Sequence, residues 1–158
     1  MGNCCMGEVS DYYDVNDLDR INNVPDDAIM DLKRTTLRGM RYCRVCSVYD
    51  GDTLDLAFFE HETLVRYKCR LAAIDTPELR SVNAETKELA YRAKDYLNTR
   101  VNKNPKAILY VQFIDNDKYG RPLVVLYDKD VKEIEFSKSI NNELITQGLA
   151  KRYSLTFQ

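Results

Sequence analysis

The sequence predicts a mainly β fold with added helices (α+β), arranged as a small, partly open barrel of five strands behind an N-terminal extension. Five stretches are enriched in β-branched and aromatic residues and tend to alternate in polarity. Two stretches with helical spacing of apolar residues follow the third and the fifth of these. The 158 residues suffice for about one domain, and a hydrophobic content of 44% is enough for one core.

Turn residues separate the five expected strands. Asp-Gly follows the first strand, a short polar stretch around His61 follows the second, and a turn over Asp117–Arg121 precedes the fifth. In that last turn, Gly120 is free to adopt a positive φ. The expected strands are Tyr42–Tyr49, Thr53–Glu60, Leu64–Ile74, Ile108–Ile114 and Leu123–Tyr127.

Two helices are expected to pack on this barrel. Residues 83–101 carry one apolar stripe at helical spacing, with charged residues mostly off it. A second helix is expected over Ile140–Gln147, because Ser139 is a suitable N-cap and Gly148 a suitable left-handed terminator. The stripe of the first helix consists of Leu89, Ala93, Tyr96, Leu97 and Val101.

Charge divides the chain into three parts. Residues 1–28 carry seven acidic residues against one basic residue, a net charge of −6, and are interpreted as a flexible acidic extension. Residues 29–40 are interpreted as a helix and linker, with the helix starting near Asp26, and residues 41–158 as the folded domain. The 18 acidic and 22 basic residues after residue 28 give +4, a mild excess that suits a domain binding a polyanion.

The first residues match an acylation signal. Gly2 is the acceptor for N-myristoylation, and Cys4 and Cys5 are candidate palmitoylation sites. One myristoyl chain binds membranes only marginally, and an acidic segment is repelled by anionic lipid, so the cysteines have to supply the second anchor. Met6 departs from the preferred Ser or Thr, and the alternative is an unmodified start with two incidental cysteines.

The sequence also predicts where the protein is located. It shows no secretory signal and no apolar run of the roughly 20 residues that a membrane-spanning helix needs. Its five cysteines are odd in number and unevenly spaced, which does not indicate a disulfide framework. An intracellular protein is therefore expected, not secreted, in a eukaryotic or viral setting, and anchored on the cytoplasmic face of a membrane if the acylation occurs.

The chemistry is concentrated between residues 48 and 78. One arginine and four carboxylates lie at the ends of expected strands: Arg70 with Asp50, Asp52, Asp75 and Glu78. Carboxylates suit a hard divalent cation such as calcium, and an arginine suits a phosphate because its planar fork donates two hydrogen bonds. Together they indicate phosphodiester chemistry. Taken alone, Asp50-Gly51-Asp52 also fits an ordinary hairpin turn.

Four short strings of residues, two of them in the segment just described, make the chain resemble the staphylococcal nuclease-like (thermonuclease) family. The four strings occur in the family's order and span roughly residues 40 to 155. The resemblance implies an OB-fold barrel, a fold that commonly binds oligonucleotides, and a calcium-dependent nuclease that hydrolyses DNA and RNA. The strings are Asp50-Gly51-Asp52-Thr53, Arg70 to Glu78, Asp117 to Arg121, and Gln147-Gly148-Leu149-Ala150-Lys151.

The resemblance assigns a role to each matched residue. Asp52, Asp75 and the backbone carbonyl of Thr76 are the expected ligands of one Ca²⁺ ion, and Asp50 is expected to hold a water beside it. Glu78 is the expected general base, with orientation of the attacking water as the alternative role. Arg70 and Arg121 are the expected clamp on the scissile phosphate, where their charge stabilises the transition state.

Three further residues are expected to contact the substrate. The resemblance places Lys118 and Tyr119 on the binding face, and Tyr153 is a candidate second stacking platform, although residues 151–155 do not align cleanly with the family's pattern. An aromatic beside a basic residue suits single-stranded nucleic acid, because bases stack on rings. DNA and RNA are thus the expected partners, single strands favoured, and no protein partner is inferred.

Two alternatives to a free, active nuclease remain. One is a membrane-tethered OB-fold module that binds nucleic acid or protein without catalysis. The other is an enzyme held inactive by its acidic segment, residues 8–27, lying over the basic site. Deleting residues 1–28 distinguishes the second, because activity is then expected to rise, most clearly at low salt.

Overall fold

The computed structural model describes residues 23–25, 27 and 36–154. The chain divides into two compact units, Met1–Thr35 and Thr36–Gln158, and the second contains the barrel. Gly2, Cys4 and Cys5 lie outside the described residues. So do the acidic extension and the expected helix after Asp26, apart from residues 23–25 and 27.

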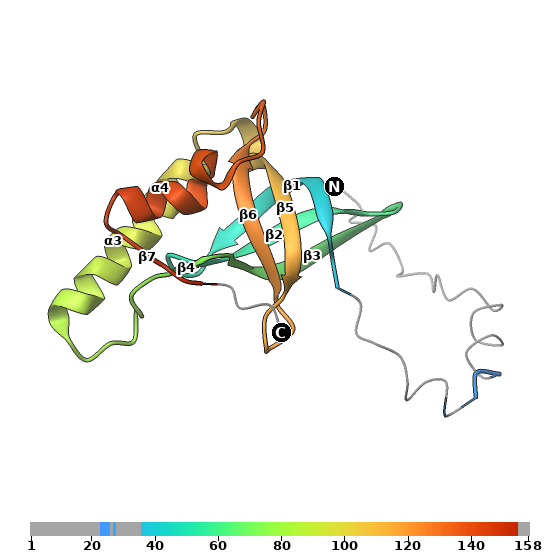
Figure 1. Ribbon diagram of the computed structural model, residues 1–158, viewed down its shortest axis with the longest axis horizontal. Helices are drawn as coiled ribbons and strands as arrows, with labels where there is room; N and C mark the ends of the chain where they lie inside the picture. The colour runs from blue at the N-terminus through green and yellow to red at the C-terminus, as the bar shows by residue number, and fades with distance from the viewer. Residues whose placement is uncertain (1–22, 26, 28–35, 155–158) are drawn as a thin grey trace, which may run out of the picture. The chain divides into compact units, whose positions relative to one another are not determined.

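Five strands form the barrel, as predicted. Their order around it is β1-β2-β3-β6-β5, and β1 closes the ring by pairing with β5 (Figure 1). All neighbouring pairs are antiparallel except β3 with β6. The strands are β1 (Gly39–Val48), β2 (Thr53–Glu60), β3 (Thr63–Leu71), β5 (Ile108–Asn116) and β6 (Pro122–Asp128).

The barrel is closed rather than partly open, and one buried asparagine strengthens the closure. β3 and β6 share only two paired positions, Arg70 with Leu123 and Leu71 with Val124. The Nδ2 of Asn141 donates to the carbonyls of Ala72 and Val124, both at 3.0 Å, so it bridges the two chain segments at this seam. Its Oδ1 accepts from the Leu126 amide at 3.0 Å. The fully buried Asn141 thereby satisfies backbone groups that the short pairing leaves open.

The strand expected over Leu64–Ile74 is two elements, and this changes the site. β3 ends at Leu71, and Ala73 has a left-handed φ of 62°, which an extended strand cannot accommodate. The chain turns there and resumes as β4 (Ile74–Asp75), which pairs with β7 (Lys151–Arg152). The turn directs Asp75 along a path separate from the barrel wall.

The two expected helices are confirmed, and the second begins after its predicted N-cap. α3 (Ala84–Val101) begins after Asn83, whose side chain accepts from the Thr86 amide, and it buries Ala90, Ala93, Leu97 and Val101. α4 (Ile140–Thr146) begins after Ser139, whose side chain accepts from the Asn142 amide. Gly148 follows with a φ of 70°.

No helix in the described part of the chain is long and apolar enough to cross a membrane. Two short 3₁₀ turns complete the fold, η1 (Pro105–Ala107) and η2 (Phe136–Lys138).

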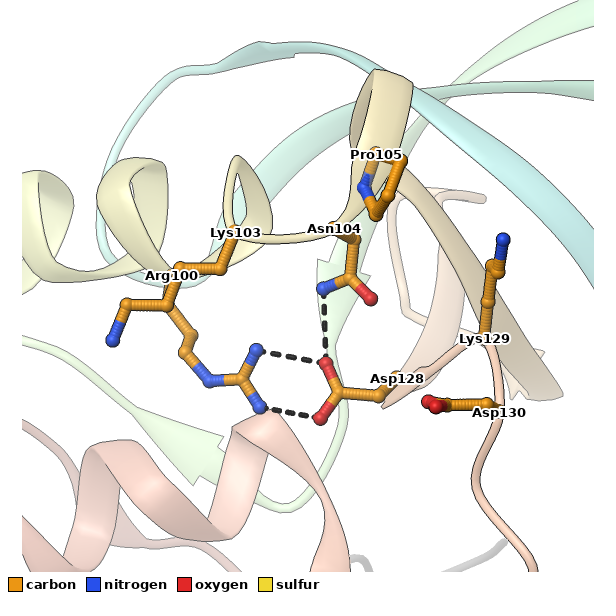
Figure 2. Close-up of a pocket in the computed structure, with 7 residues that line it drawn as sticks. All are labelled: Arg100, Lys103, Asn104, Pro105, Asp128, Lys129 and Asp130. Carbon is orange, nitrogen blue, oxygen red and sulfur yellow. Dashed lines mark hydrogen bonds and ion pairs between the residues drawn. The ribbon is translucent and has the colours of Figure 1, made fainter.

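A polar cluster fastens α3 to β6 and α4. Arg100, near the end of α3, donates two parallel bonds to Asp128 at 2.8 and 2.7 Å and two to Glu143 at 2.7 and 3.0 Å. Asn104 adds a bond of 2.9 Å to Asp128. Arg100, Asn104 and Asp128 line an open pocket of about 580 Å³, and Figure 2 shows the contacts among these three residues. Hydrogen bonds from Arg100 lower the pKa of Asp128. All donors used by Arg100 face protein carboxylates, so we assign the cluster a structural role.

Replacing Arg100 with methionine is expected to lower the free energy of unfolding by about 2–3 kcal/mol, because a mostly buried cation is lost and two carboxylates keep facing each other. The expected loss is smaller than for a fully buried pair, because Asp128 and Glu143 are partly exposed and solvent screens their charge. Urea unfolding measures it. Arg38→Met is the control, because Arg38 makes an exposed pair with Asp115 and its loss is expected to change stability by less than about 1 kcal/mol. Equal effects of the two substitutions would contradict the assignment.

Candidate active site

Asp52, in the β1–β2 loop, is a buried carboxylate that accepts hydrogen bonds from three donors. It is only 4% exposed. Its Oδ1 accepts from the Thr53 hydroxyl at 3.0 Å and from Arg70 at 3.1 Å, and its Oδ2 accepts from the Thr76 amide at 3.3 Å. Its own amide donates to the Asp50 carboxylate at 3.1 Å. The orientation of this side chain is therefore set before any ligand arrives.

Gly51 permits this loop to lie against α3. A Cβ built on Gly51 meets the Ala93 Cβ at 2.7 Å and the Thr76 side chain at 3.0 Å. The first contact is with a short side chain on a helix, which cannot turn away. Gly51 is thus required by a close approach, in addition to the turn-forming role that its sequence context predicts.

Gly51→Ala is expected to displace the loop and to cost about 1–3 kcal/mol in stability through overpacking. Activity is expected to fall as well, because Asp50 and Asp52 flank the displaced residue. Thermal unfolding and cleavage rates measure the two effects. Gly39→Ala is a backbone control, since Gly39 has a positive φ but no atom within 4 Å of an added Cβ. Loss of stability without loss of activity in Gly51→Ala would show that the loop geometry is not needed for function.

Arg70 joins Asp52 to Asp75. One terminal nitrogen of Arg70 lies 3.1 Å from Asp52 Oδ1 and the other lies 2.9 Å from Asp75 Oδ1. The Asp75 side chain is 62% exposed, in contrast to Asp52. The two carboxylates therefore converge on one cationic group at the open edge formed by the β1–β2 loop, β3 and β4.

Electrostatics leave Asp52 short of positive charge. Burial raises the pKa of Asp52, and the nearby Arg70 lowers it again. The neighbouring Asp50 carboxylate adds to the rise, while hydrogen bonds from Thr53 and Thr76 oppose it. The net direction is upward, so one arginine does not fully offset the burial of this carboxylate. An additional cation at this place is expected to favour its ionised form.

Glu78 lies three residues after Asp75, at the start of a turn. Its carbonyl accepts from the Ser81 amide at 3.1 Å, so its backbone begins this turn. Its side chain is exposed, and its carboxylate has no hydrogen bond or ion pair within residues 36–154. A carboxylate on a turn stiffened by Pro77 and free of protein partners is available to water.

Asp117 organises the turn that carries Arg121. Its Oδ1 accepts from the Tyr119 and Arg121 amides, both at 2.9 Å, and its Oδ2 accepts from Arg121 Nε at 2.7 Å. Gly120 has the expected positive φ, 83°. Burial acts to raise the pKa of Asp117, but the backbone and side-chain bonds from Arg121 outweigh it, and the pKa is lowered. The Asp117 side chain thus fixes the guanidinium from its Nε edge.

The other edge of Arg121 is available to a ligand. Its two terminal nitrogens have no hydrogen bond to any residue of the described range. Its guanidinium lies 5.7 Å from the Tyr119 ring centroid, and Lys118 Nζ lies 5.0 Å from the same ring. Tyr119 is 71% exposed. The turn therefore presents a free guanidinium edge, an aromatic face and an amine together.

The predicted residues form two groups on neighbouring strands. Contacts unite Asp50, Asp52, Arg70, Asp75 and Thr76, while Lys118, Tyr119 and Arg121 form the second group. Arg121 precedes β6 by one residue, and β6 pairs with β3 at Arg70. No hydrogen bond or ion pair joins the two groups within residues 36–154. The pairing of β3 with β6 therefore brings Arg121 within two positions of Arg70 in register.

Tyr153 lies at the edge that carries Asp75. Its amide donates to the Ala73 carbonyl at 2.8 Å, just after Lys151 pairs with Asp75. Its side chain is 59% exposed, and no ring contact ties it to the Tyr119 group among the described residues. Tyr153 is near the first group and remains a prediction as a stacking platform.

Sequence reasoning missed three residues that position this site. They are Gly51, needed for close packing, Ala73, which turns the chain toward Asp75, and Asn141, which seals the β3–β6 seam. The prediction used Asp117 only as part of a matching string. Asp117 lies four residues before Arg121, in a turn that contains a glycine. This spacing is the sequence signal from which its hydrogen bonds could have been predicted.

Comparison with known proteins agrees with this geometry. The family model described as "Staphylococcal nuclease homologue" matches residues 68–158. The match includes Arg70, Asp75, Glu78 and Arg121, and it starts after Asp52. No curated protein matches the chain. The matched range covers more than half of the sequence, and the chain folds into the expected five-stranded barrel. The chain therefore belongs to the staphylococcal nuclease homologue family.

Proposed function

We propose that this protein is a calcium-dependent nuclease that hydrolyses phosphodiester bonds of DNA and RNA. One observation carries the proposal: two carboxylates converge on Arg70, while the carboxylate of Glu78, close to them in the chain, has no partner in the described range. A domain that only binds has no need of converging carboxylates, because they repel a phosphate. A domain that hydrolyses phosphodiesters needs both the cation site and the base.

The donor set fits calcium in its chemistry. Asp52 and Asp75 supply hard anionic oxygens, the Thr76 backbone lies next to Asp52, and the raised pKa of Asp52 marks a need for further positive charge. Among the described residues, no group of three or more His, Cys, Asp or Glu is placed to hold a metal ion, so the proposed site depends on two carboxylates and a backbone carbonyl. Such a site leaves coordination positions for water and for a phosphate oxygen. When bound, Ca²⁺ supplies positive charge and oxygen coordination beside the scissile phosphate.

The protein groups divide the remaining chemistry. Glu78 accepts the proton of the water that attacks phosphorus, or holds that water in line. As the new P–O bond forms, the bond to the 5′-oxygen breaks, which leaves a 3′-phosphate and a 5′-hydroxyl once that oxygen takes a proton from solvent. Arg121 donates its free edge to the oxygens on which charge accumulates, and Arg70 exchanges a carboxylate partner for a phosphate oxygen.

A paired measurement separates this function from that of a non-catalytic binding module. Purified protein is mixed with labelled single-stranded DNA, and binding is followed by anisotropy in chelator and cleavage by gel in calcium. The proposal predicts binding in both conditions and cleavage only in calcium, with 5′-hydroxyl ends. Binding without cleavage at any calcium concentration would leave the binding module as the function.

We also propose that the protein is tethered to a membrane through acyl chains on Gly2 and on Cys4 or Cys5. The Met-Gly start and the adjacent cysteines support this. Labelling with alkyne fatty acids in eukaryotic cells tests it. Loss of myristate label in Gly2→Ala and of palmitate label in Cys4→Ser/Cys5→Ser is expected, and an unlabelled wild-type chain would refute it.

A further inference from the structure

Basic side chains continue outward from Arg70 along β3. Arg66, Lys68 and Arg70 occupy alternate positions of this strand, and alternate residues of a strand share one face, about 6.6 Å apart. Cys69 and Leu71, between and after them, are buried in the barrel core. The three cations therefore lie on the outer face, and Figure 1 shows the β2–β3 hairpin reaching away from the helices.

β1 adds a fourth cation on the same outer face, level with Arg66 and separated from it by β2. Arg44 pairs with Ala57, and Ala57 pairs with Arg66 across β2. The small Ala57 side chain between the two arginines leaves this row open. Arg44 is exposed and has no ion pair within the described range. Arg66, Lys68 and Arg70 thus extend from the candidate active site along β3, and Arg44 lies beside the far end of this series. We call these four residues the β3 basic stripe.

A buried carboxylate holds part of this stripe in place. Asp55 is 5% exposed and accepts from Arg66 Nε at 2.8 Å and from the Tyr49 hydroxyl at 2.9 Å. Tyr49 is 40% exposed as a residue, and Lys68 Nζ lies 3.8 Å from the centroid of its ring. Asp55 offsets the charge of Arg66, and Asp52 and Asp75 face Arg70. Arg44 and Lys68 have no ion pair within the described range and keep their positive charge. The result is an ordered aromatic ring set among cations.

We infer that the β3 basic stripe, with Tyr49, is a second binding subsite for single-stranded nucleic acid, one that takes the phosphates and a base beyond the scissile phosphate at Arg70. This inference rests on the proposed function for its direction, since Arg70 marks where the scissile phosphate lies. Evenly spaced cations follow a flexible phosphate backbone, and an exposed ring stacks a base without regard to sequence. The bases of a duplex are paired and stacked on one another and cannot stack on Tyr49, so single strands are the favoured ligand.

Salt dependence of binding tests the subsite without relying on cleavage. The probe is fluorescein-labelled oligothymidylate of about 12 nucleotides, within the range that one OB-fold covers. Its affinity is measured in chelator from about 50 to about 200 mM salt. The test variant is Arg44→Gln/Lys68→Gln, which removes two exposed charges and leaves the Arg66–Asp55 pair intact. The matched control, Lys129→Gln/Lys132→Gln, removes the same charge from exposed positions after β6.

Each contact to a single strand contributes about 0.7 to the slope of log affinity against log salt. The test variant is therefore expected to have a slope smaller by about 1.4, and to lose about sevenfold less affinity across this salt range than the wild type. The control is expected to keep the wild-type slope. Equal slopes for the test variant and the wild type would overturn the inference. If the slopes of the wild type and the test variant differ as expected but the wild type never cleaves in calcium, the subsite stands and the nuclease proposal fails.

Discussion

Arg121→Ala is expected to lower kcat for single-stranded DNA by about 10²–10³, which corresponds to about 2.7–4 kcal/mol of lost transition-state stabilisation. The reason is geometric: Asp117 holds Arg121 from its Nε edge, and the two terminal nitrogens are left free to meet a phosphate. A donor that is already oriented contributes most where charge accumulates, so kcat is expected to fall more than KM rises.

Two further variants identify the cause of that loss. Arg121→Lys keeps the charge but loses the planar fork, and an intermediate kcat is expected. Arg92→Ala, which removes an exposed arginine from α3, is expected to leave kcat unchanged. Urea unfolding of all three checks that the fold is retained. If Arg121→Ala and Arg92→Ala had the same kcat, Arg121 would have no part in the chemistry.

Asp52→Asn is expected to abolish calcium-dependent activity and, in chelator, to make the protein more stable. Burial raises the pKa of Asp52, so the folded protein binds a proton at this group more readily than the unfolded chain. Where the folded state binds more protons, the free energy of unfolding falls as pH rises. An uncharged side chain of the same size removes that penalty.

The pH range of the effect follows from its sign. Below the unfolded pKa of Asp, about 3.9, Asp52 is protonated in both states, and variant and wild type are expected to differ little. The gain of the variant is expected to grow as pH rises through the raised folded pKa and to remain at neutral pH. Adding calcium is expected to stabilise the wild type alone, because only it binds the ion.

Urea midpoints at pH 4 and pH 7, with chelator and with calcium, measure these differences. Asp75→Asn is the matched control, since it removes a mostly exposed carboxylate. It is expected to lose activity without gaining stability. A variant Asp52→Asn that is less stable than the wild type at pH 7 in chelator would show that the pairing with Arg70 outweighs the cost of burial.

Much of the barrel could be predicted from the sequence because its strands are marked by local patterns. The alternation in Thr53–Glu60, the Ser139 cap and the positive φ of Gly120 each depend on neighbouring residues alone. The membership in the family could be predicted for the same reason, from short strings in order. The site residues within those strings were then found at the edge where their strands end.

What could not be predicted depends on contacts between distant segments. Asn141 lies 69 residues from Ala72, whose carbonyl it binds, and no local pattern distinguishes it from a surface asparagine. The left-handed turn at Ala73 has no glycine to mark it, so β3 and β4 were predicted as one strand. The bridge that Arg70 makes between Asp52 and Asp75 likewise follows from that turn.

The most direct test of the central claim is digestion of single-stranded DNA by the purified protein beside a Glu78→Gln/Arg121→Ala double variant, each with calcium and with chelator. The claim predicts cleavage by the wild type in calcium only, and no cleavage by the double variant, although it still binds the DNA. Cleavage of equal rate by the double variant, or by the wild type in chelator, would contradict it.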